Sequence, residues 1–279
     1  FRESGNATAV EVFFREMGRR GFDPDIVTYN VVVDALCKKR RIDDAFDLVE
    51  VMKRKECRPN IWTYTTLIHG LGIVRKKNQA YEVFAELKRN GFEPDTAVYN
   101  ALISCFCKAG DVDGGLRLMK KMEKESVGCD NVTYHTLLSA FRDLGKKEEV
   151  CELFGIMMAR DHLLKASTAV ILMKFFCNSG LNNMAFKLWD YVVKKGCCPH
   201  GHVSNLFITE LCYSGKLQEA HDCFREILEK GLHPYRQSFD ILQRFYREAR
   251  REHQLSELVR KMKQLQSCLP ASEEYVSIP

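Results

Sequence analysis

Two stretches within residues 26–60 carry apolar side chains at positions i, i+3, i+4 and i+7, the spacing of one face of an α-helix. The first stretch contains Tyr29, Val32, Val33 and Leu36, and the second contains Ala45, Leu48, Val49 and Met52. A polar segment, residues 38–41, separates the two stretches, and Pro59 follows the second. Because proline cannot continue a helix, we predict two antiparallel helices of about a dozen residues each, joined by short turns.

The same pattern returns every 35 residues along the chain, as the tyrosines Tyr29, Tyr64, Tyr99 and Tyr134 show. A fixed period of this length, kept without insertion or deletion, indicates a stack of repeated helix pairs. We therefore predict an all-α solenoid of antiparallel helix pairs with the repeats 26–60, 61–95, 96–130, 131–165, 166–200, 201–235 and 236–270. Residues 1–25 are predicted to form a partial repeat, and residues 271–279 a C-terminal tail.

The composition is that of an ordinary folded chain, with 46% hydrophobic and 28% charged residues. A net charge of +5 permits a polyanionic partner without requiring one. The chain has no apolar run of about 18 residues, so no membrane span is expected. It starts at Phe1 in the middle of a repeat, and we therefore expect a fragment whose targeting segment lies upstream.

The sequence gives little indication of catalytic or metal chemistry. Four of the twelve cysteines, Cys37, Cys107, Cys177 and Cys212, share one position of the repeat, which favours helix packing over disulfides or zinc. A reducing compartment fits this cysteine pattern. The chain has no P-loop, no nucleophile elbow and no H-x-E with C-x-x-C deaminase pattern. We expect no enzymatic activity, no cofactor and no metal.

Several segments of the repeat resemble one known family. Val27-Thr28-Tyr29-Asn30, Leu36-Cys37-Lys38 and Pro59-Asn60, together with Ala45 and Met52, are similar to a pentatricopeptide repeat. The resemblance covers residues 1 to about 270, and the tetratricopeptide repeat differs in its 34-residue period. It points to the P class of plant organellar members, and implies a right-handed superhelical solenoid that reads about one RNA base per repeat.

The resemblance also implies roles for three positions of each repeat. The fifth and the last residue choose the base, and the second residue stacks against it. In this chain the implied base-reading pairs are Asn30 with Asn60, Thr65 with Asp95, and Asn100 with Asp130, which resemble readers of a pyrimidine, guanine and uracil. The implied stacking residues are Val27, Trp62, Ala97 and Val132, and the implied phosphate contacts are Lys38 and Lys108.

The second half of the chain departs from this pattern. Its corresponding pairs are His135 with Lys165, Val170 with His200, Asn205 with Tyr235, and Asp240 with Pro270. The stacking position changes to Ser167, His202 and Gln237. Since valine cannot hydrogen-bond to a base edge, we expect non-standard contacts here, with His135, Lys165 and Asn205 as candidates. These repeats are expected to bind RNA backbone, structured RNA or protein.

Structural interpretations remain open for some of these residues. Asn at the fifth position can satisfy free N–H groups at a helix start, Trp62 can cover a junction between repeats, and residues 38–41 can form a solvated turn.

The sequence leaves three candidate functions. The first is an organellar single-stranded RNA-binding protein in transcript processing, stability or translation, in the mitochondrion or alternatively the chloroplast. The second is a structural subunit of an organellar ribosome or other large ribonucleoprotein, contacting ribosomal RNA and proteins. The third is a protein-only scaffold, and none involves a membrane.

Overall fold

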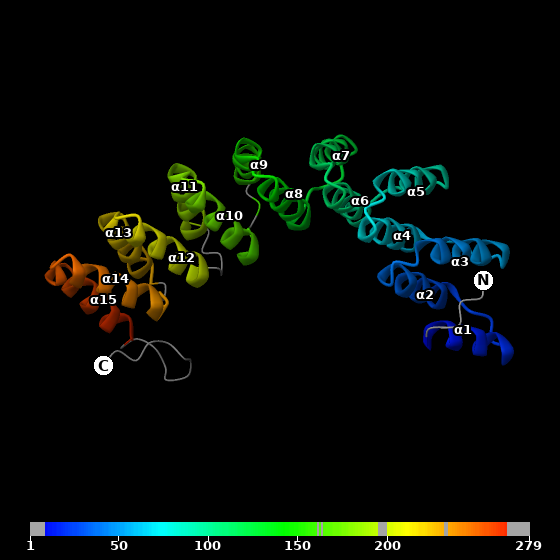
Figure 1. Cartoon of the computed structure of the whole chain (residues 1–279), viewed down its shortest axis with the longest axis horizontal. Helices are drawn as coiled ribbons and strands as arrows, with labels where there is room; N and C mark the ends of the chain where they lie inside the picture. The colour runs from blue at the N-terminus through cyan, green and yellow to red at the C-terminus, as the bar shows by residue number, and fades with distance from the viewer. Residues whose placement is uncertain (1–8, 161, 163, 195–199, 232–233, 267–279) are drawn as a thin grey trace. The chain divides into compact units, whose positions relative to one another are not determined.

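The structure, a computed structural model, describes residues 9–160, 162, 164–194, 200–231 and 234–266 (Figure 1). Every regular element in this part of the chain is a helix, and none is both long and apolar enough to span a lipid bilayer. The chain divides into two compact units, residues 1–145 and 146–279. The predicted fold, antiparallel helix pairs repeated every 35 residues, is confirmed within both units.

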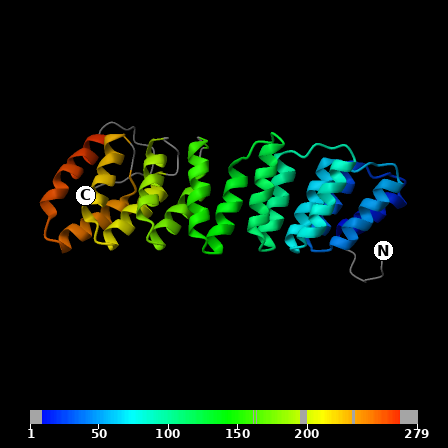
Figure 2. The ribbon, with the colours of Figure 1, turned by 90° about the horizontal axis from the view of Figure 1, so that it is seen from above.

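The first unit stacks helix pairs so that the first helices of successive pairs pack side by side (Figure 2). Each second helix packs against its own first helix and against the first helix of the next pair. The helices of this unit are α1 (Ala9–Arg19), α2 (Ile26–Lys38), α3 (Ile42–Arg54), α4 (Ile61–Ile73), α5 (Lys77–Arg89), α6 (Thr96–Lys108), α7 (Val112–Lys124) and α8 (Asn131–Asp143).

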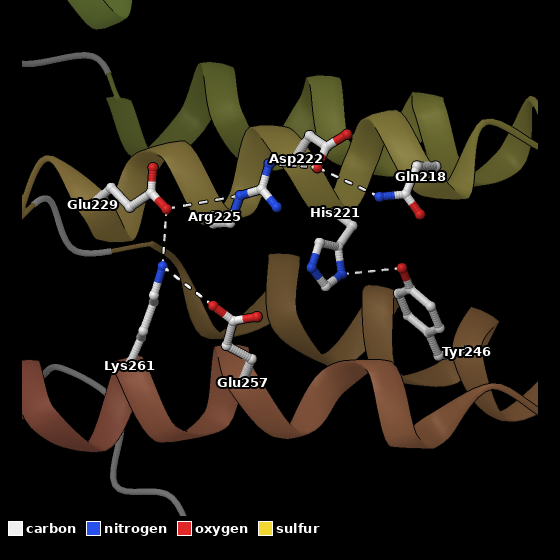
Figure 3. Close-up of polar contacts among 8 residues, drawn as sticks. All are labelled: Gln218, His221, Asp222, Arg225, Glu229, Tyr246, Glu257 and Lys261. Atoms are coloured by element: carbon white, nitrogen blue, oxygen red, sulfur yellow. Dashed lines mark hydrogen bonds and ion pairs between the residues drawn. The ribbon is translucent and has the colours of Figure 1, made fainter.

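The second unit repeats this arrangement, with α10, α12 and α14 adjacent to one another. Its elements are α9 (Lys147–Ala159), α10 (Ala166–Asn178), α11 (Asn182–Lys194), α12 (His200–Tyr213), α13 (Leu217–Glu229), α14 (Arg236–Glu248), a short 3₁₀ helix (Glu252–Leu255) and α15 (Ser256–Gln266). Helix α15 packs on α13, and Figure 3 shows an ion pair between these two helices and a hydrogen bond between α13 and α14. Lys261 lies 2.8 Å from Glu229 on α13, and the Tyr246 hydroxyl lies 3.0 Å from His221 Nδ1.

The first helices of the first unit begin at polar residues that cap them. The side chains of Asp25, Asn60, Asp95 and Asp130 each accept hydrogen bonds from backbone N–H groups in the first turn of the following helix. Such caps contribute about 0.5–2 kcal/mol each. The interpretation of the fifth-position Asn30 as a residue that satisfies a helix start is therefore wrong, because Asp25 caps α2 and Asn30 lies in its second turn.

Two of the corresponding positions in the second unit do not cap the helices that follow them. Lys165 precedes α10 and Tyr235 precedes α14, and neither side chain makes a capping hydrogen bond. The first turns of these helices therefore keep backbone N–H groups that no side chain at the cap position satisfies. The departure from the repeat pattern thus affects local helix stability as well as the surface.

The core of the first unit is built on the repeated tyrosines and on small residues. Tyr64 and Tyr99 are buried, and the Tyr99 hydroxyl donates to Glu125 at 2.7 Å. A Cβ atom added at Gly115 would lie 3.1 Å from Cys107 Sγ, so only a small residue fits between these helices. Burial raises the pKa of the Cys107 thiol to about 12, which keeps it protonated and suits it to packing.

Candidate nucleic-acid interface

The first helices of the first unit expose apolar side chains at the second position of each repeat. Val27 is 62% exposed, Trp62 48% and Val132 45%, and Ala97 is exposed as well. Because these exposed side chains recur at the same position of successive first helices, they form a row on one surface. The four predicted stacking residues are therefore available to a ligand in the way the sequence prediction requires.

A groove of about 790 Å³ runs across α4, α6 and α8. Six predicted site residues line it: Thr65, Asp95, Ala97, Asn100, Asp130 and Val132. Five further residues complete the lining, and the sequence prediction did not name them: His69, Thr96, Ala101, Ser104 and Thr136. The structure therefore brings predicted residues of three successive repeats into one depression.

Asn100 is held in place by two side chains of the following helix start. Its Nδ2 donates to Asp130 Oδ1 at 3.0 Å, and its Oδ1 accepts from the hydroxyl of Thr133 at 2.6 Å. Asp130 in turn accepts from the backbone N–H groups of Val132 and Thr133, both at 2.9 Å. Because each partner is fixed by others, the Asn100 amide has one orientation, with one N–H left over for a ligand.

The charge of Asp130 supports this arrangement. Burial alone would raise the pKa of its carboxyl, but hydrogen bonds from the Thr133 backbone N–H, from Asn100 and from the Val132 backbone N–H outweigh that effect and lower it. Asp130 is therefore a carboxylate at neutral pH, and it can only accept hydrogen bonds. Because Asp130 can only accept, the amide nitrogen of Asn100 must face Asp130 and the amide oxygen must face away from it.

Asn30 has the same network but a more enclosed position. Its Nδ2 donates to Asn60 Oδ1 at 3.4 Å, and its Oδ1 accepts from the Thr63 hydroxyl at 2.7 Å. The Asn30 residue is only 7% exposed. The structure therefore joins the predicted pair Asn30 and Asn60, and it leaves Asn30 a small accessible edge.

Thr65 and Asp95 both line the groove, but other groups engage them. The Thr65 hydroxyl donates to the Ile61 carbonyl at 2.7 Å, and Asp95 accepts from the Val98 backbone at 2.9 Å. The position that holds Thr63 and Thr133 in the other repeats is Val98 here, which has no hydroxyl to offer. The threonine that orients the fifth-position asparagine could therefore have been found from the sequence, because Thr63 and Thr133 both stand at the third position of the following repeat.

The two predicted phosphate contacts differ in their surroundings. Lys38 is exposed and its Nζ lies 2.6 Å from Asp34 Oδ2, so part of its charge is neutralised. Lys108 is exposed and has no ion-pair partner among the described residues. The pKa of His69 is lowered, first by desolvation of its ring and then by the nearby positive charge of Lys108, so its imidazole is neutral at pH 7.

The non-standard candidates of the second half lie in less uniform settings. Asn205 donates to Gln237 Oε1 at 3.3 Å and accepts from the Ser238 hydroxyl at 3.1 Å. Lys165 is exposed and Val170 is half-buried, while His135 is half-buried in the first unit. The side chain of His200 and all of Pro270 lie outside the described residues.

Family models match most of the chain. The model of the PPR repeat family matches residues 3–38, 24–73 and 94–143, and that of the pentatricopeptide repeat domain matches residues 60–109. A third model, PPR repeat, matches residues 132–162, 167–197 and 203–232. Together these matches extend over both units.

Curated relatives of similar sequence come from Arabidopsis thaliana. The chain is 37% identical over 278 residues to one pentatricopeptide repeat-containing protein, covering 98% of the chain and 55% of the relative. A second pentatricopeptide repeat-containing protein is 52% identical over 252 residues, with 90% and 51% covered. The chain thus spans about half the length of the curated relatives it matches.

Solved structures of similar fold include the maize pentatricopeptide repeat protein PPR10. Its crystal structure aligns with a TM-score of 0.63 and 25% identity, covering 92% of this chain and 36% of PPR10. The structure of PPR10 in complex with an 18-nt psaJ RNA element aligns with a TM-score of 0.55 and 19% identity, covering 96% and 45%.

Proposed function

Because the chain belongs to the pentatricopeptide repeat family, we propose that it binds single-stranded RNA along the exposed face of α2, α4, α6 and α8. The observation that carries this proposal is the Asn100–Asp130–Thr133 network beside the exposed Val132. It combines an oriented amide, which suits the hydrogen-bonding edge of a base, with an apolar side chain, which suits the face of a base.

The network has the chemistry of a uracil reader. Asn100 keeps one N–H donor and one lone pair of Oδ1 after its bonds to Asp130 and Thr133 are counted. Uracil offers a carbonyl acceptor next to an N3–H donor on its Watson–Crick edge, so the two patterns are complementary. Cytosine offers an acceptor at N3 instead, and its mismatch with the fixed amide would leave one group unpaired.

The two preceding repeats extend the reading. Thr65 with Asp95 resembles a guanine reader, and Asn30 with Asn60 resembles a pyrimidine reader. Read parallel to the chain, the three repeats select pyrimidine–G–U from 5′ to 3′. The apolar row at the second positions then contributes affinity that does not depend on sequence, on the order of 1–3 kcal/mol per base where the stacking partner is aromatic, as at Trp62.

The biological role we propose is passive. The protein acts in an organelle, the mitochondrion or alternatively the chloroplast, where it occupies a segment of a transcript. An occupied segment is blocked to nucleases and to base pairing, which affects processing, stability or translation. The RNA-bound structure of PPR10 supports a role of this kind by fold alone.

A second candidate function is favoured by the second unit. In this unit the helix pairs are kept, but Lys165 and Tyr235 do not cap their helices and Val170 occupies a base-reading position. This state fits a structural subunit of an organellar ribosome or other large ribonucleoprotein, which holds RNA and protein by shape. Co-sedimentation with such particles in high salt would favour this function, and a free monomeric pool would oppose it.

The test of the main proposal is binding of short RNAs with defined sequence. Wild-type protein should prefer an RNA with pyrimidine–G–U over scrambled RNAs of the same composition in fluorescence anisotropy. Asn100→Ala and Thr65→Ala should each weaken this preference more than they weaken binding to the scrambles. Equal affinity for all RNAs, unchanged by both substitutions, would show that the chain does not read bases.

A further inference from the structure

A groove of about 440 Å³ lies between α11 and α13, two successive second helices of the second unit. Figure 1 shows both helices on the same side of α12. The groove is lined by Trp189 and Asp190 on α11 and by four carboxylates on α13, those of Glu219, Asp222, Glu226 and Glu229. Arg225 is the only cation among the described residues that line it. We call this feature the α11–α13 groove.

An aromatic core holds one wall of the groove in place. The indole of Trp189 is buried, and its ring centroid lies 5.6 Å from that of Phe207 on α12. Its Nε1–H donates to Glu226 Oε2 at 2.9 Å, so it joins α11 to α13. Because Glu226 is fixed by a buried donor, its negative charge keeps one position in the groove.

Part of the negative charge of the groove is balanced within the chain. Arg225 lies 2.8 Å from Asp222 and 3.7 Å from Glu229, and Glu229 also meets Lys261 (Figure 3). These pairs lie at the surface, so they are weak and exchange readily. Asp190 and Glu219 are exposed and have no ion-pair partner among the described residues. These two carboxylates are therefore available to a cation from outside.

The thiol of Cys223, which also lines the groove, responds to these charges. Burial first, and then the negative charges of Glu226, Asp222, Asp190 and Glu219, raise its pKa to about 12. Four carboxylates from two helices therefore act on one point of the groove wall. A concave surface with charge of one sign attracts a partner of the opposite sign.

The repeat does not require acidic residues at these positions. Helices α7 and α13 start at Val112 and Leu217, which are 105 residues or three repeats apart. The positions of Glu219, Asp222, Glu226 and Glu229 on α13 are occupied on α7 by Gly114, Arg117, Lys121 and Lys124. The same helix of the repeat forms with either set of charges, so the acidic set is not explained by folding.

Helix α7 carries the opposite charge on the first unit. It has four basic and two acidic residues, whereas α13 has one basic and four acidic residues. Lys120 and Lys124 lie one turn apart, are exposed and have no ion-pair partner among the residues that the structure describes. Lys121 Nζ lies 5.7 Å from the ring centroid of Tyr81 and 5.3 Å from that of Phe84, which holds it against α5.

We propose that α7 of one copy of this chain docks in the α11–α13 groove of a second copy. Lys120 and Lys124 then approach Asp190 and Glu219, and charges that have no partner within one chain pair between two. Each copy offers one basic helix and one acidic groove, so two copies that exchange both contacts form a closed pair.

The size of the contact sets its strength. One helix in one groove makes a small and polar interface, and such interfaces give weak, transient association. Because the attraction is between exposed charges, salt should weaken it. This inference goes beyond RNA binding and does not depend on it, since it involves the second helices and not the row on α2, α4, α6 and α8.

The test measures the mass of the whole chain in solution without RNA, because a polyanion would compete for the cations of α7. In sedimentation velocity, wild type should associate as its concentration rises at 0.1 M salt and should be monomeric at 1 M. The screening length falls over this range from about 10 Å to about 3 Å.

Two double variants reverse the charges on either side of the contact. Lys120→Glu with Lys124→Glu makes α7 acidic, and Asp190→Lys with Glu219→Lys makes the groove basic. Each should raise the dissociation constant of self-association by about 100-fold, because like charges then face each other. None of the four residues has an ion pair to lose among the described residues, and circular dichroism checks that each variant is folded.

A mixture of the two double variants is the decisive sample. The acidic α7 of one then meets the basic groove of the other, and the two unchanged surfaces also match, so the equimolar mixture should associate like wild type. Arg75→Glu with Lys76→Glu reverses two exposed charges in the turn between α4 and α5 and is the matched control. It should associate like wild type.

Three results would overturn the inference. Wild type that is monomeric at 0.1 M salt would show that the copies do not associate. Variants that lose association alone and do not regain it when mixed would place the contact elsewhere. A monomeric wild type that binds an oligo-arginine peptide, when Asp190→Lys with Glu219→Lys does not, would assign the groove to a basic partner protein instead of a second copy.

Discussion

The hydroxyl of Thr133 donates to Oδ1 of Asn100 across 2.6 Å, from the start of one repeat to the first helix of the repeat before it. Thr63 contacts Asn30 in the same way at 2.7 Å, and Ser238 contacts Asn205 at 3.1 Å. Every asparagine at the fifth position of a repeat therefore meets a hydroxyl at the third position of the next. The orientation of each of these amides is thus set by two repeats.

Substitution of Thr133 tests this relationship. Thr133→Val keeps the shape but removes the donor, so the Asn100 amide can rotate and present either end to a base. We expect the preference for uracil over cytosine at the third base of pyrimidine–G–U to fall by about 1 kcal/mol, the net worth of one hydrogen bond. The measurement is the ratio of dissociation constants for the two RNAs.

Thr133→Ser is the matched control, because it keeps the hydroxyl and should keep the preference. A Thr133→Val protein that discriminates as well as wild type would mean that Asp130 alone orients Asn100. A loss of affinity for both RNAs without any change in their ratio would indicate a defect in folding or stacking instead.

The missing cap of α10 makes a second prediction, on stability. Lys165 precedes α10 without capping it, whereas Asp130 caps α8 with two backbone hydrogen bonds. Lys165→Asp should supply a cap and also place negative charge at the positive end of the helix dipole. We expect stabilisation by about 1 kcal/mol, measured as slower amide hydrogen exchange in the first turn of α10.

Lys165→Ala is the control for the capping effect of Lys165→Asp. Lys165→Ala removes the lysine without adding a cap, so it should not protect the first turn. If Lys165→Asp and Lys165→Ala exchange at the same rate, the N-terminus of α10 is satisfied in another way. The experiment also shows whether Lys165 contacts RNA, because both variants would then bind RNA more weakly.

His69 leads to a prediction about pH. Desolvation, and then the positive charge of Lys108, lower its pKa below the ordinary value of 6.5 in the free protein. A phosphate bound nearby would favour the imidazolium and raise that pKa. Binding then takes up a proton, so RNA affinity should increase as pH falls below about 6.5, and should level off below the pKa of the free protein.

The matched variant is His69→Gln, which keeps a polar side chain but cannot titrate. Its affinity should change less with pH than that of wild type over the same range, measured at constant ionic strength. Identical pH profiles for the two proteins would place the RNA phosphates away from His69, and would leave its role to the lining of the groove.

The helical scaffold could be predicted from sequence because it depends on local and repeated information. The spacing of Tyr29, Val32, Val33 and Leu36 defines a helix face, and its return every 35 residues fixes how the pairs stack. The polar residues Asn60, Asp95 and Asp130 were predicted as ligand contacts, and the structure shows that they also cap helices. A helix-start role was considered from the sequence only for the fifth position, whereas the structure gives that role to the last residue of each of these repeats.

The details of the groove depend on contacts between repeats and were not predicted. Asn30 is buried and Asn100 is partly open, although each is bonded to the last residue of its own repeat and to a threonine of the next. The spacing of residues along the chain does not predict this difference in exposure. The Thr65 hydroxyl donates to the Ile61 carbonyl of its own helix, and Val98 has no hydroxyl to offer it. His69 was missed because a single histidine has no signature until its neighbours are known.

The two lysines predicted to contact phosphate should contribute unequally to salt dependence. Lys108 has no ion-pair partner among the described residues, whereas Lys38 lies 2.6 Å from Asp34. Lys108→Ala should therefore lower the slope of log affinity against log salt by about 0.7, the value for one phosphate on a single strand. Lys38→Ala should lower this slope less, since Asp34 already neutralises part of the Lys38 charge.

Two further variants test the role of each charge. Asp34→Ala should strengthen binding by releasing Lys38. Lys124→Ala removes an exposed charge at the end of α7 and should leave the slope unchanged. Equal losses for Lys108, Lys38 and Lys124 would mean that RNA responds to overall charge and that neither predicted lysine makes a specific contact.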